Sequence, residues 1–145
     1  MMINGVEKLR ETIASIEVAM LTTRVESGEL LSRPMYTLSV GHEGDIWFFT
    51  SKNSPKMDEI EENNMVNISY SDTHSHTYAS ISGTAKCVAD EELKRRLWND
   101  LHEAWFPRGI DDPELCLLRV NMKSAEVWDQ ETAAMVTVIA KQEAM

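Results

Sequence analysis

The sequence predicts a mainly β protein: a six-stranded antiparallel barrel with an N-terminal helix and two further helices at its periphery. Two observations lead to this fold class. Segments of strand character follow one another along most of the chain, and the turns between them are short. Only a few segments carry the spacing of an amphipathic helix. Sequential strands joined by short turns are typical of antiparallel barrels.

The first half of the chain supplies one helix, three strands and a second helix. Apolar residues at helical spacing predict a helix over residues 5–16, formed by Val6, Leu9, Ile13 and Ile16. Strands are predicted over 18–23, 30–40 and 46–50, with glycine-containing turns between them. Ser54 followed by Pro55 is a common helix start, since serine suits the N-cap and proline the first helical position. We therefore expect a second helix over residues 55–63.

The second half is predicted to complete the barrel. Strands are expected over 65–71 and 77–89, and Asp90 is a candidate cap for a helix that keeps its period through Leu93, Leu97 and Leu101. Residues 107–113 form a loop. Residues 115–122 and 125–128 are predicted to pair as a closing hairpin, and 134–140 to add a last strand. Residues 1–145 are expected to form a single domain.

Composition narrows the function. The 145 residues are 43% hydrophobic and 26% charged, with a formal net charge of −10. A protein this acidic and without a basic run is not expected to bind nucleic acid. No long apolar stretch or signal peptide is evident, so we expect a cytoplasmic protein without membrane partners. Cys87 and Cys116 are far apart and are expected to be free thiols.

Possible phosphate ligands concentrate between residues 33 and 56. The segment combines an arginine, three hydroxyls and a lysine with a helix start: Arg33, Thr50, Ser51, Ser54 and Lys56. Free N–H groups at a helix N-terminus attract anions, and arginine and lysine bind phosphate by charge-assisted hydrogen bonds. The pattern therefore predicts a site for a phosphorylated cofactor. A plain helix start with solvated lysines is the alternative that these residues leave open.

Several short motifs follow one another in a recognisable order. They are Ser32-Arg33-Pro34-Met35, Asp45-Ile46-Trp47-Phe48-Phe49-Thr50, Ser54-Pro55-Lys56, Val66-Asn67-Ile68-Ser69-Tyr70, Ile81-Ser82-Gly83-Thr84-Ala85, Leu97-Trp98, Phe106-Pro107-Arg108-Gly109, Asp112-Pro113 and Ala125-Glu126-Val127-Trp128. Their order and spacing resemble the FMN-binding split-barrel superfamily of pyridoxamine 5′-phosphate oxidase, and most closely its general stress protein branch. The likeness covers residues 5–130.

The resemblance implies an FMN cofactor and assigns residues to it. It places the Arg33 side chain and the segment with Ser51, Ser54 and Lys56 at the phosphate, and Phe49 and Thr50 at the ribityl chain and phosphate. It lays the strand of Pro34, Met35 and Tyr36 along the flavin ring. Tyr78 falls where the parent oxidase has a flavin-contacting glutamine. Trp128 matches a tryptophan that contacts FMN across a homodimer interface. One phosphate contact of the oxidase, an arginine, is replaced by Pro55.

The resemblance implies a flavin-dependent oxidoreductase linked to general stress. The parent oxidase continues past its tryptophan into a basic segment that completes the substrate site, whereas this chain continues with Asp129-Gln130-Glu131. We therefore do not expect pyridoxamine 5′-phosphate to be the substrate, which would be another small molecule or an electron carrier. A non-catalytic flavin-binding or flavin-buffering protein is the alternative, and a haem or deazaflavin binder is a weaker one.

The remaining motifs in the sequence carry less information about function. His74 and His76 have the spacing of metal ligands on a strand, but their polar surroundings favour a solvated loop, and no metal site is predicted. There is no nucleophile-elbow motif and no G-x-G-x-x-G after a strand, so hydrolase and Rossmann chemistry are not supported. Trp98 is expected to pack in the core. Trp105 could either pack or cover the flavin.

Overall fold

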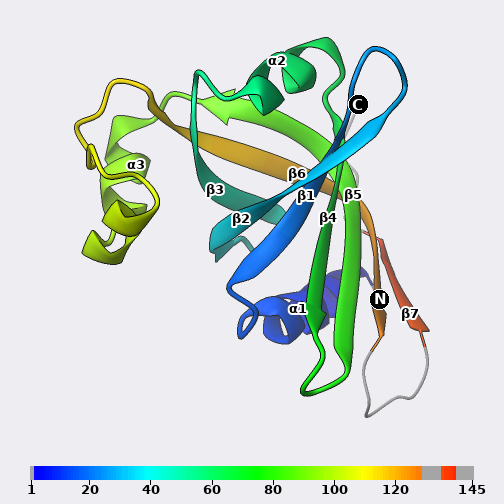
Figure 1. The fold of residues 1–145 in the computed structure, drawn as a ribbon. Coiled ribbons are helices and arrows are strands. Elements are labelled where there is room, and N and C mark those ends of the chain that lie inside the picture. Colours follow the sequence, from blue (N-terminus) through cyan, green and yellow to red (C-terminus); the bar gives the residue numbers. More distant parts are fainter. Residues whose placement is uncertain (1, 129–134, 140–145) are drawn as a thin grey trace.

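The computed structural model describes residues 2–128 and 135–139 and shows the predicted six-stranded antiparallel barrel (Figure 1). Strands lie side by side in the order β3-β2-β1-β4-β5-β6, and β3 also pairs with β6, which closes the ring. The strands are β1 (Val18–Arg24), β2 (Leu30–Val40), β3 (Asp45–Ser51), β4 (Met65–Asp72), β5 (Thr77–Val88) and β6 (Leu115–Trp128). A seventh strand, β7 (Met135–Ile139), pairs with the last residues of β6.

The barrel is split because β2 changes its neighbour halfway along. Residues 30–36 of β2 pair with β1, whereas Thr37 to Val40 pair with β3. The register between β2 and β3 is irregular at this point, and it ends at Thr37 opposite Phe48. Beyond that pair the two strands diverge. Residues 30–36 pair with β1 on one side and have no strand of the described chain on the other. Proline lacks a backbone N–H and is tolerated in a strand that has such an unpaired side, which makes Pro34 compatible with β2.

Two helices complete the main core. Helix α1 (Met2–Ile13) and helix α2 (Pro55–Glu62) lie at opposite ends of the barrel in Figure 1. Val6, Leu9 and Ile13 of α1 are buried in the same apolar cluster as Met57 and Ile60 of α2. The inward residues of the strands fill the space between them. The cluster excludes water from both ends, and burial of apolar surface is the main source of stability in such a core.

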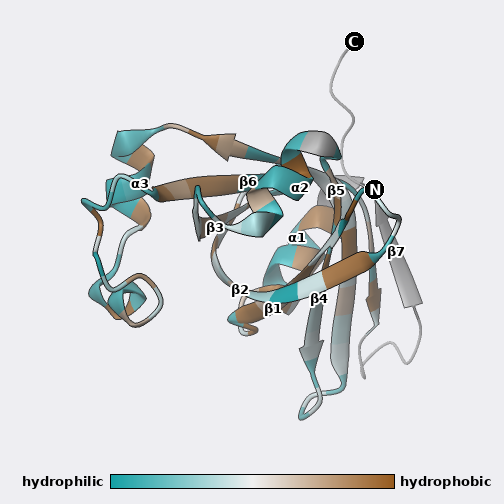
Figure 2. Cartoon of the chain, turned by 45° about the horizontal axis from the view of Figure 1, so that its top comes forward, coloured by the Kyte–Doolittle hydropathy of each residue, from teal (hydrophilic) through white to brown (hydrophobic). Residues whose placement is uncertain are grey.

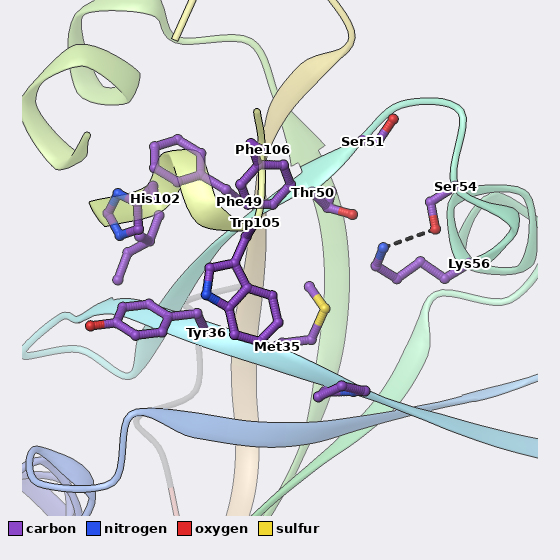
Figure 3. Close-up of a pocket in the computed structure, with 12 residues that line it drawn as sticks. Met35, Tyr36, Phe49, Thr50, Ser51, Ser54, Lys56, His102, Trp105 and Phe106 are labelled. Atoms are coloured by element: carbon purple, nitrogen blue, oxygen red, sulfur yellow. Dashed lines mark hydrogen bonds between the residues drawn. The ribbon is translucent and has the colours of Figure 1, made fainter. Parts of the chain in front are cut away.

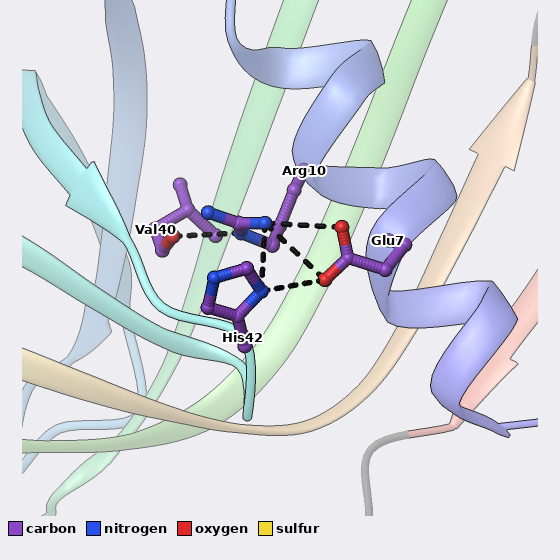
Figure 4. Close-up of polar contacts among 4 residues, drawn as sticks. All are labelled: Glu7, Arg10, Val40 and His42. Atoms are coloured by element: carbon purple, nitrogen blue, oxygen red, sulfur yellow. Dashed lines mark hydrogen bonds and ion pairs between the residues drawn. The ribbon is translucent and has the colours of Figure 1, made fainter.

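Polar contacts hold α1 against the turn between β2 and β3 (Figure 4). Arg10 donates from Nε to the carbonyl oxygen of Val40 at 2.9 Å and from Nη1 to the carboxylate of Glu7 at 3.0 Å. His42 Nδ1 lies 2.8 Å from Glu7 Oε1. The His42 and Glu7 side chains are both exposed, so solvent weakens this contact and it adds little to stability.

A second, smaller apolar cluster lies outside the barrel. Phe49, Leu115 and Leu117 project outward from β3 and β6, and α3 (Glu91–Leu97) covers them. Figure 2 shows the hydrophobic part of β6 running toward α3. A short 3₁₀ helix, η1 (Asp100–Ala104), follows α3. Trp98 packs edge-on against Phe49, with ring centroids 5.5 Å apart, so the predicted packing role of Trp98 is confirmed.

Three predicted elements differ from the structure, and the first is the N-terminal helix, which spans Met2–Ile13 rather than residues 5–16 and leaves Ile16 outside it. The helix after Asp90 ends at Leu97, and Leu101 lies in η1 with 77% of its surface exposed, so the expected helical period does not extend to it. Asn99 starts η1 by accepting a hydrogen bond from the Leu101 N–H, which competes with continuation of α3. The predicted closing hairpin is wrong as well: residues 115–128 form one continuous strand, β6.

The predicted loop around His74 and His76 and the two free thiols are found as expected. Residues 73–76 form a turn in which Asp72 Oδ1 accepts hydrogen bonds from the backbone N–H groups of His74 and Ser75. Cys87 and Cys116 are free thiols. Within the described residues, no helix is long and apolar enough to cross a membrane.

Candidate functional site

A pocket lies where β2 and β3 diverge, between the start of α2 and the segment of η1 (Figure 3). Its volume is about 250 Å³. The residues that line it are Pro34, Met35, Tyr36, Leu38, Phe49, Thr50, Ser51, Ser54, Lys56, His102, Trp105 and Phe106. Eight of the predicted cofactor residues are therefore brought together: Pro34, Met35, Tyr36, Phe49, Thr50, Ser51, Ser54 and Lys56.

One end of the pocket is polar and cationic. Lys56 is only 7% exposed, and its ammonium group donates to Ser54 Oγ at 2.9 Å. Burial, and then the nearby charge of Arg33, lower the pKa of Lys56. A buried ammonium group is costly unless it is paired and hydrogen-bonded. An anion in the pocket would therefore stabilise the charged form of Lys56.

The hydroxyl groups at this end are available to a ligand. Ser54 occupies the predicted N-cap position of α2, but its side chain makes no capping hydrogen bond and instead accepts one from Lys56. Thr50 is 2% exposed, and its Oγ1 has no hydrogen-bond partner among the described residues. A buried hydroxyl without a partner costs about 1–3 kcal/mol, so such groups often mark a ligand contact. The donor set of Thr50, Ser54 and Lys56 fits a phosphate.

Arg33 lies near this end but does not line the pocket. Its Nη1 and Nη2 donate to the two carboxylate oxygens of Glu59 at 3.2 and 3.4 Å, and Nη1 also donates to Thr23 Oγ1 at 3.2 Å. Thr23 is fully buried and donates to Glu59 Oε2 at 2.5 Å. These three residues join β1, β2 and α2. Glu59, which lies about one helical turn after Lys56 in α2, thus holds the guanidinium group of Arg33 near the polar end of the pocket.

The other end of the pocket is aromatic. His102 is 7% exposed, and its ring centroid lies 5.4 Å from those of Tyr36 and Phe49. Its Nδ1 accepts a hydrogen bond from the Asn99 N–H, which completes a capping box at the start of η1. The sequence interpretation did not include His102. The spacing Asn99-x-x-His102 could have indicated a helix start, but nothing local indicates that the imidazole reaches the pocket.

Two predicted cofactor residues lie elsewhere. Tyr78 and Trp128 face each other across β5 and β6, at the far end of those strands, and neither lines the pocket. Trp128 is 37% exposed. Both were assigned by resemblance, and Trp128 specifically to a contact across a dimer interface, so their roles stay predictions. Within the described residues there is no group of three or more side chains suited to hold a metal ion.

Comparison with known proteins gives a consistent picture. The family model described as "Pyridoxamine 5′-phosphate oxidase like" matches residues 4–145. Protein bli-3 of Neurospora crassa is 33% identical over 130 residues, which is 83% of this chain and 62% of bli-3. The chain thus spans less than two thirds of that curated relative.

Two solved structures illustrate the likeness of the fold. The general stress FMN/FAD binding protein of Xanthomonas citri is 31% identical, with a TM-score of 0.74 over 98% of this chain and 97% of that one. A Clostridium acetobutylicum protein related to general stress protein 26 has a TM-score of 0.79 at 21% identity, over 94% of this chain and 95% of that one.

The Arg33–Glu59–Thr23 cluster predicts a pH-dependent contribution to stability. Burial alone would raise the pKa of Glu59, but hydrogen bonds from Thr23 and Arg33 outweigh this and hold it below 4.5. A depressed carboxyl pKa adds stability above the unfolded pKa, and that stability disappears as the pH falls through the folded pKa. We expect Glu59→Gln to lower the free energy of unfolding by about 1–3 kcal/mol at pH 7. Urea unfolding measures this loss, which should shrink in acid.

Glu61→Gln is the matched control, because Glu61 is an exposed carboxylate on the same helix. It should leave the free energy of unfolding nearly unchanged at every pH. A deficit in Glu59→Gln that is the same at pH 7 and in acid would show that the carboxylate charge contributes nothing.

Proposed function

This chain belongs to the pyridoxamine 5′-phosphate oxidase-like family, and on that premise we propose that it binds FMN and uses it as an oxidoreductase linked to general stress. The observation that carries the proposal is the polar end of the pocket. There a buried lysine, a serine and a buried threonine hydroxyl that has no hydrogen-bond partner in the described part of the chain converge at the start of a helix. The name of the Xanthomonas citri relative, a general stress FMN/FAD binding protein, supports the same ligand class.

In this proposal the phosphate binds Thr50, Ser51, Ser54 and Lys56 together with N–H groups at the start of α2. The positive end of the helix dipole favours an anion at this place. Arg33 adds positive charge from the neighbouring strand while Glu59 orients its guanidinium group. The strand of Pro34, Met35 and Tyr36 runs along the ring system, and Phe49 packs beside the ribityl chain. The bound flavin supplies hydride and one-electron chemistry.

We propose further that two copies associate through an uncharged face of the barrel. The outward side chains of β1, β2, β4 and β5 in this region are small, polar or apolar: Met20, Thr22, Ser32, Pro34, Asn67, Ser69, Ser80 and Ser82. Several bond to one another, as in Asn67 Nδ2 to Ser80 Oγ at 3.1 Å and Thr22 Oγ1 to Ser32 Oγ at 2.6 Å. A surface that is depleted of charge and in which several polar side chains already bond to one another suits an interface core.

This uncharged face adjoins the flavin site. Pro34 lies in it and also lines the pocket, and Tyr78 and Trp128 pair at its far end. A pocket of about 250 Å³ is smaller than typical pockets for a ligand of FMN's size. A partner subunit would therefore provide the remaining wall, and its Trp128 is a candidate for it.

The substitution Lys56→Ala tests the phosphate site. We expect Lys56→Ala to lose about 1.5–3 kcal/mol of FMN binding free energy, or roughly 10- to 150-fold in affinity, because a charge-assisted hydrogen bond is removed. Riboflavin, which lacks the phosphate, should bind the variant and the wild type equally. Fluorescence titration of both flavins measures the two affinities. Lys52→Ala removes a neighbouring exposed lysine and should change neither.

Equal losses of FMN and riboflavin affinity in Lys56→Ala would contradict the phosphate assignment. Failure of the wild-type protein to bind either flavin would contradict the proposed cofactor altogether.

Stopped-flow reduction separates an oxidoreductase from a flavin-buffering protein. We expect NADH or NADPH to reduce the FMN-loaded protein in a fast reaction that saturates with nicotinamide concentration, because a catalytic site binds its electron donor before hydride transfer. A slow reduction whose rate rises linearly with the concentration of either nucleotide, without saturation, would instead identify a protein that only binds the flavin.

A charge placed in the uncharged face tests the dimer. The wild-type protein should scatter light as a particle of about twice 16.5 kDa. Met20→Glu should shift it toward the monomer, because burying an unpaired carboxylate is unfavourable. Ala14→Glu puts the same charge on an exposed residue after α1 and should leave the mass unchanged. A wild-type monomer that binds FMN tightly would rule out a shared site.

A further inference from the structure

The aromatic end of the pocket is chemically unlike the end that suits a phosphate. Figure 3 shows Ser54 and Lys56 on one side and His102, Phe49 and Tyr36 on the other, with Trp105 between them. His102, Trp105 and Phe106 make up this aromatic end, and Tyr36 and Phe49, which the proposed function places along the flavin, border it. Lys56 is the one charged residue among the described residues that line the pocket, and it lies at the opposite end. Among the described residues, the aromatic end therefore presents no charged side chain to a ligand.

His102 is held in one orientation and one tautomer. Edge-on contacts with Tyr36, Phe49 and Trp98, at centroid separations of 5.4, 5.4 and 5.5 Å, fix the plane of its ring. Its Nδ1 accepts from the Asn99 N–H at 3.0 Å, so the hydrogen of the neutral ring is on Nε2. Burial lowers the pKa of His102, which favours that neutral form. The ring thus offers a ligand an uncharged N–H donor.

Trp105 adds a flat apolar wall. It is 49% exposed although it lies beside a pocket, and it follows η1, where its backbone N–H donates to the His102 carbonyl oxygen at 3.0 Å. A half-exposed indole with a fixed backbone is a typical anchor for a planar ligand, since its large surface becomes buried at little entropic cost. The flavin would occupy part of the same pocket, which holds about 250 Å³, so the ligand at this end is limited to about one ring.

We propose that the aromatic end is a second subsite, which binds a flat, uncharged aromatic compound carrying a carbonyl oxygen. The compound stacks on Trp105, and its carbonyl oxygen accepts a hydrogen bond from Nε2 of His102. The net charge of −10 disfavours anionic compounds at long range. The inference rests on the proposed function in one respect: this compound would be the reaction partner of the flavin.

Two probes of the same shape isolate the hydrogen bond. Duroquinone (tetramethyl-1,4-benzoquinone) has two carbonyl oxygens, and its methyl groups block addition of the free cysteine thiols. Durene has the same methylated ring without oxygens. Ligand-observed NMR gives both affinities, with the protein free of flavin and with FMN at saturation. We expect duroquinone to bind in both cases, with affinities that agree within about threefold.

His102→Gln is the decisive variant. Glutamine at this position can still complete the capping box with Asn99, so η1 should be retained while the imidazole is lost. The variant should bind duroquinone about tenfold more weakly and durene unchanged, as expected for one lost hydrogen bond. Trp105→Leu should weaken both probes alike, about tenfold, because it removes the stacking surface.

Several outcomes would overturn the subsite. Equal losses of both probes in His102→Gln would show that the imidazole donates no hydrogen bond. Undiminished binding of both probes in Trp105→Leu would place them elsewhere. Exclusion of duroquinone by FMN would assign the aromatic end to the flavin ring itself. The titration of the flavin-free protein tests the subsite even if FMN does not bind. Failure of the subsite hypothesis can therefore be distinguished from failure of the proposed cofactor.

Discussion

The change of partner along β2 is the constraint on which the rest of the structure depends. A strand that pairs with β1 up to Tyr36 and with β3 from Thr37 cannot keep both neighbours along its whole length. The barrel must therefore part between β2 and β3. Helix α2 covers one side of this gap and η1 the other, and the pocket is the space between them. The residues that line the pocket lie here because β2 and β3 are not hydrogen-bonded to each other along this stretch. If they were paired, the strands would leave no space for a ligand.

Electrostatics near α2 serve stability and binding through the same residues. Lys56 and Arg33 bring two cations together at the edge of the core, which would be unfavourable without compensation. Glu59 and Thr23 compensate Arg33 by direct hydrogen bonds. Lys56 has only the Ser54 hydroxyl as a hydrogen-bond partner among the described residues. The structure thus pairs Arg33 with an internal carboxylate and leaves Lys56, which has no such direct partner among the described residues, suited to an external anion.

Local patterns in the sequence predicted most of the strands and the start of α2, because turn residues and helix caps act over a few positions. Contacts between distant segments were not predictable in this way. The pairing of Arg33 with Glu59 needs α2 folded over β2, and the position of His102 in the pocket needs η1 docked on β3. The continuous β6 was also missed. Gly83 of β5 lies so close to β6 that a Cβ there would be 2.2 Å from the Asn121 carbonyl oxygen, and the register shifts beside it. What looked like a turn is therefore a bulge.

Closure of the ring has a consequence for how the chain reaches this structure. Strand β3 finds its second neighbour only in β6, where Asp45 pairs with Asn121. Because β6 follows the first five strands in the chain, β3 presents an unpaired edge during synthesis until residues 115–128 can pair with it. Folding that depends on such distant pairing is slow compared with helical proteins of the same size. For a nascent chain, the edge of β3 is thus the place where a chaperone would protect it best.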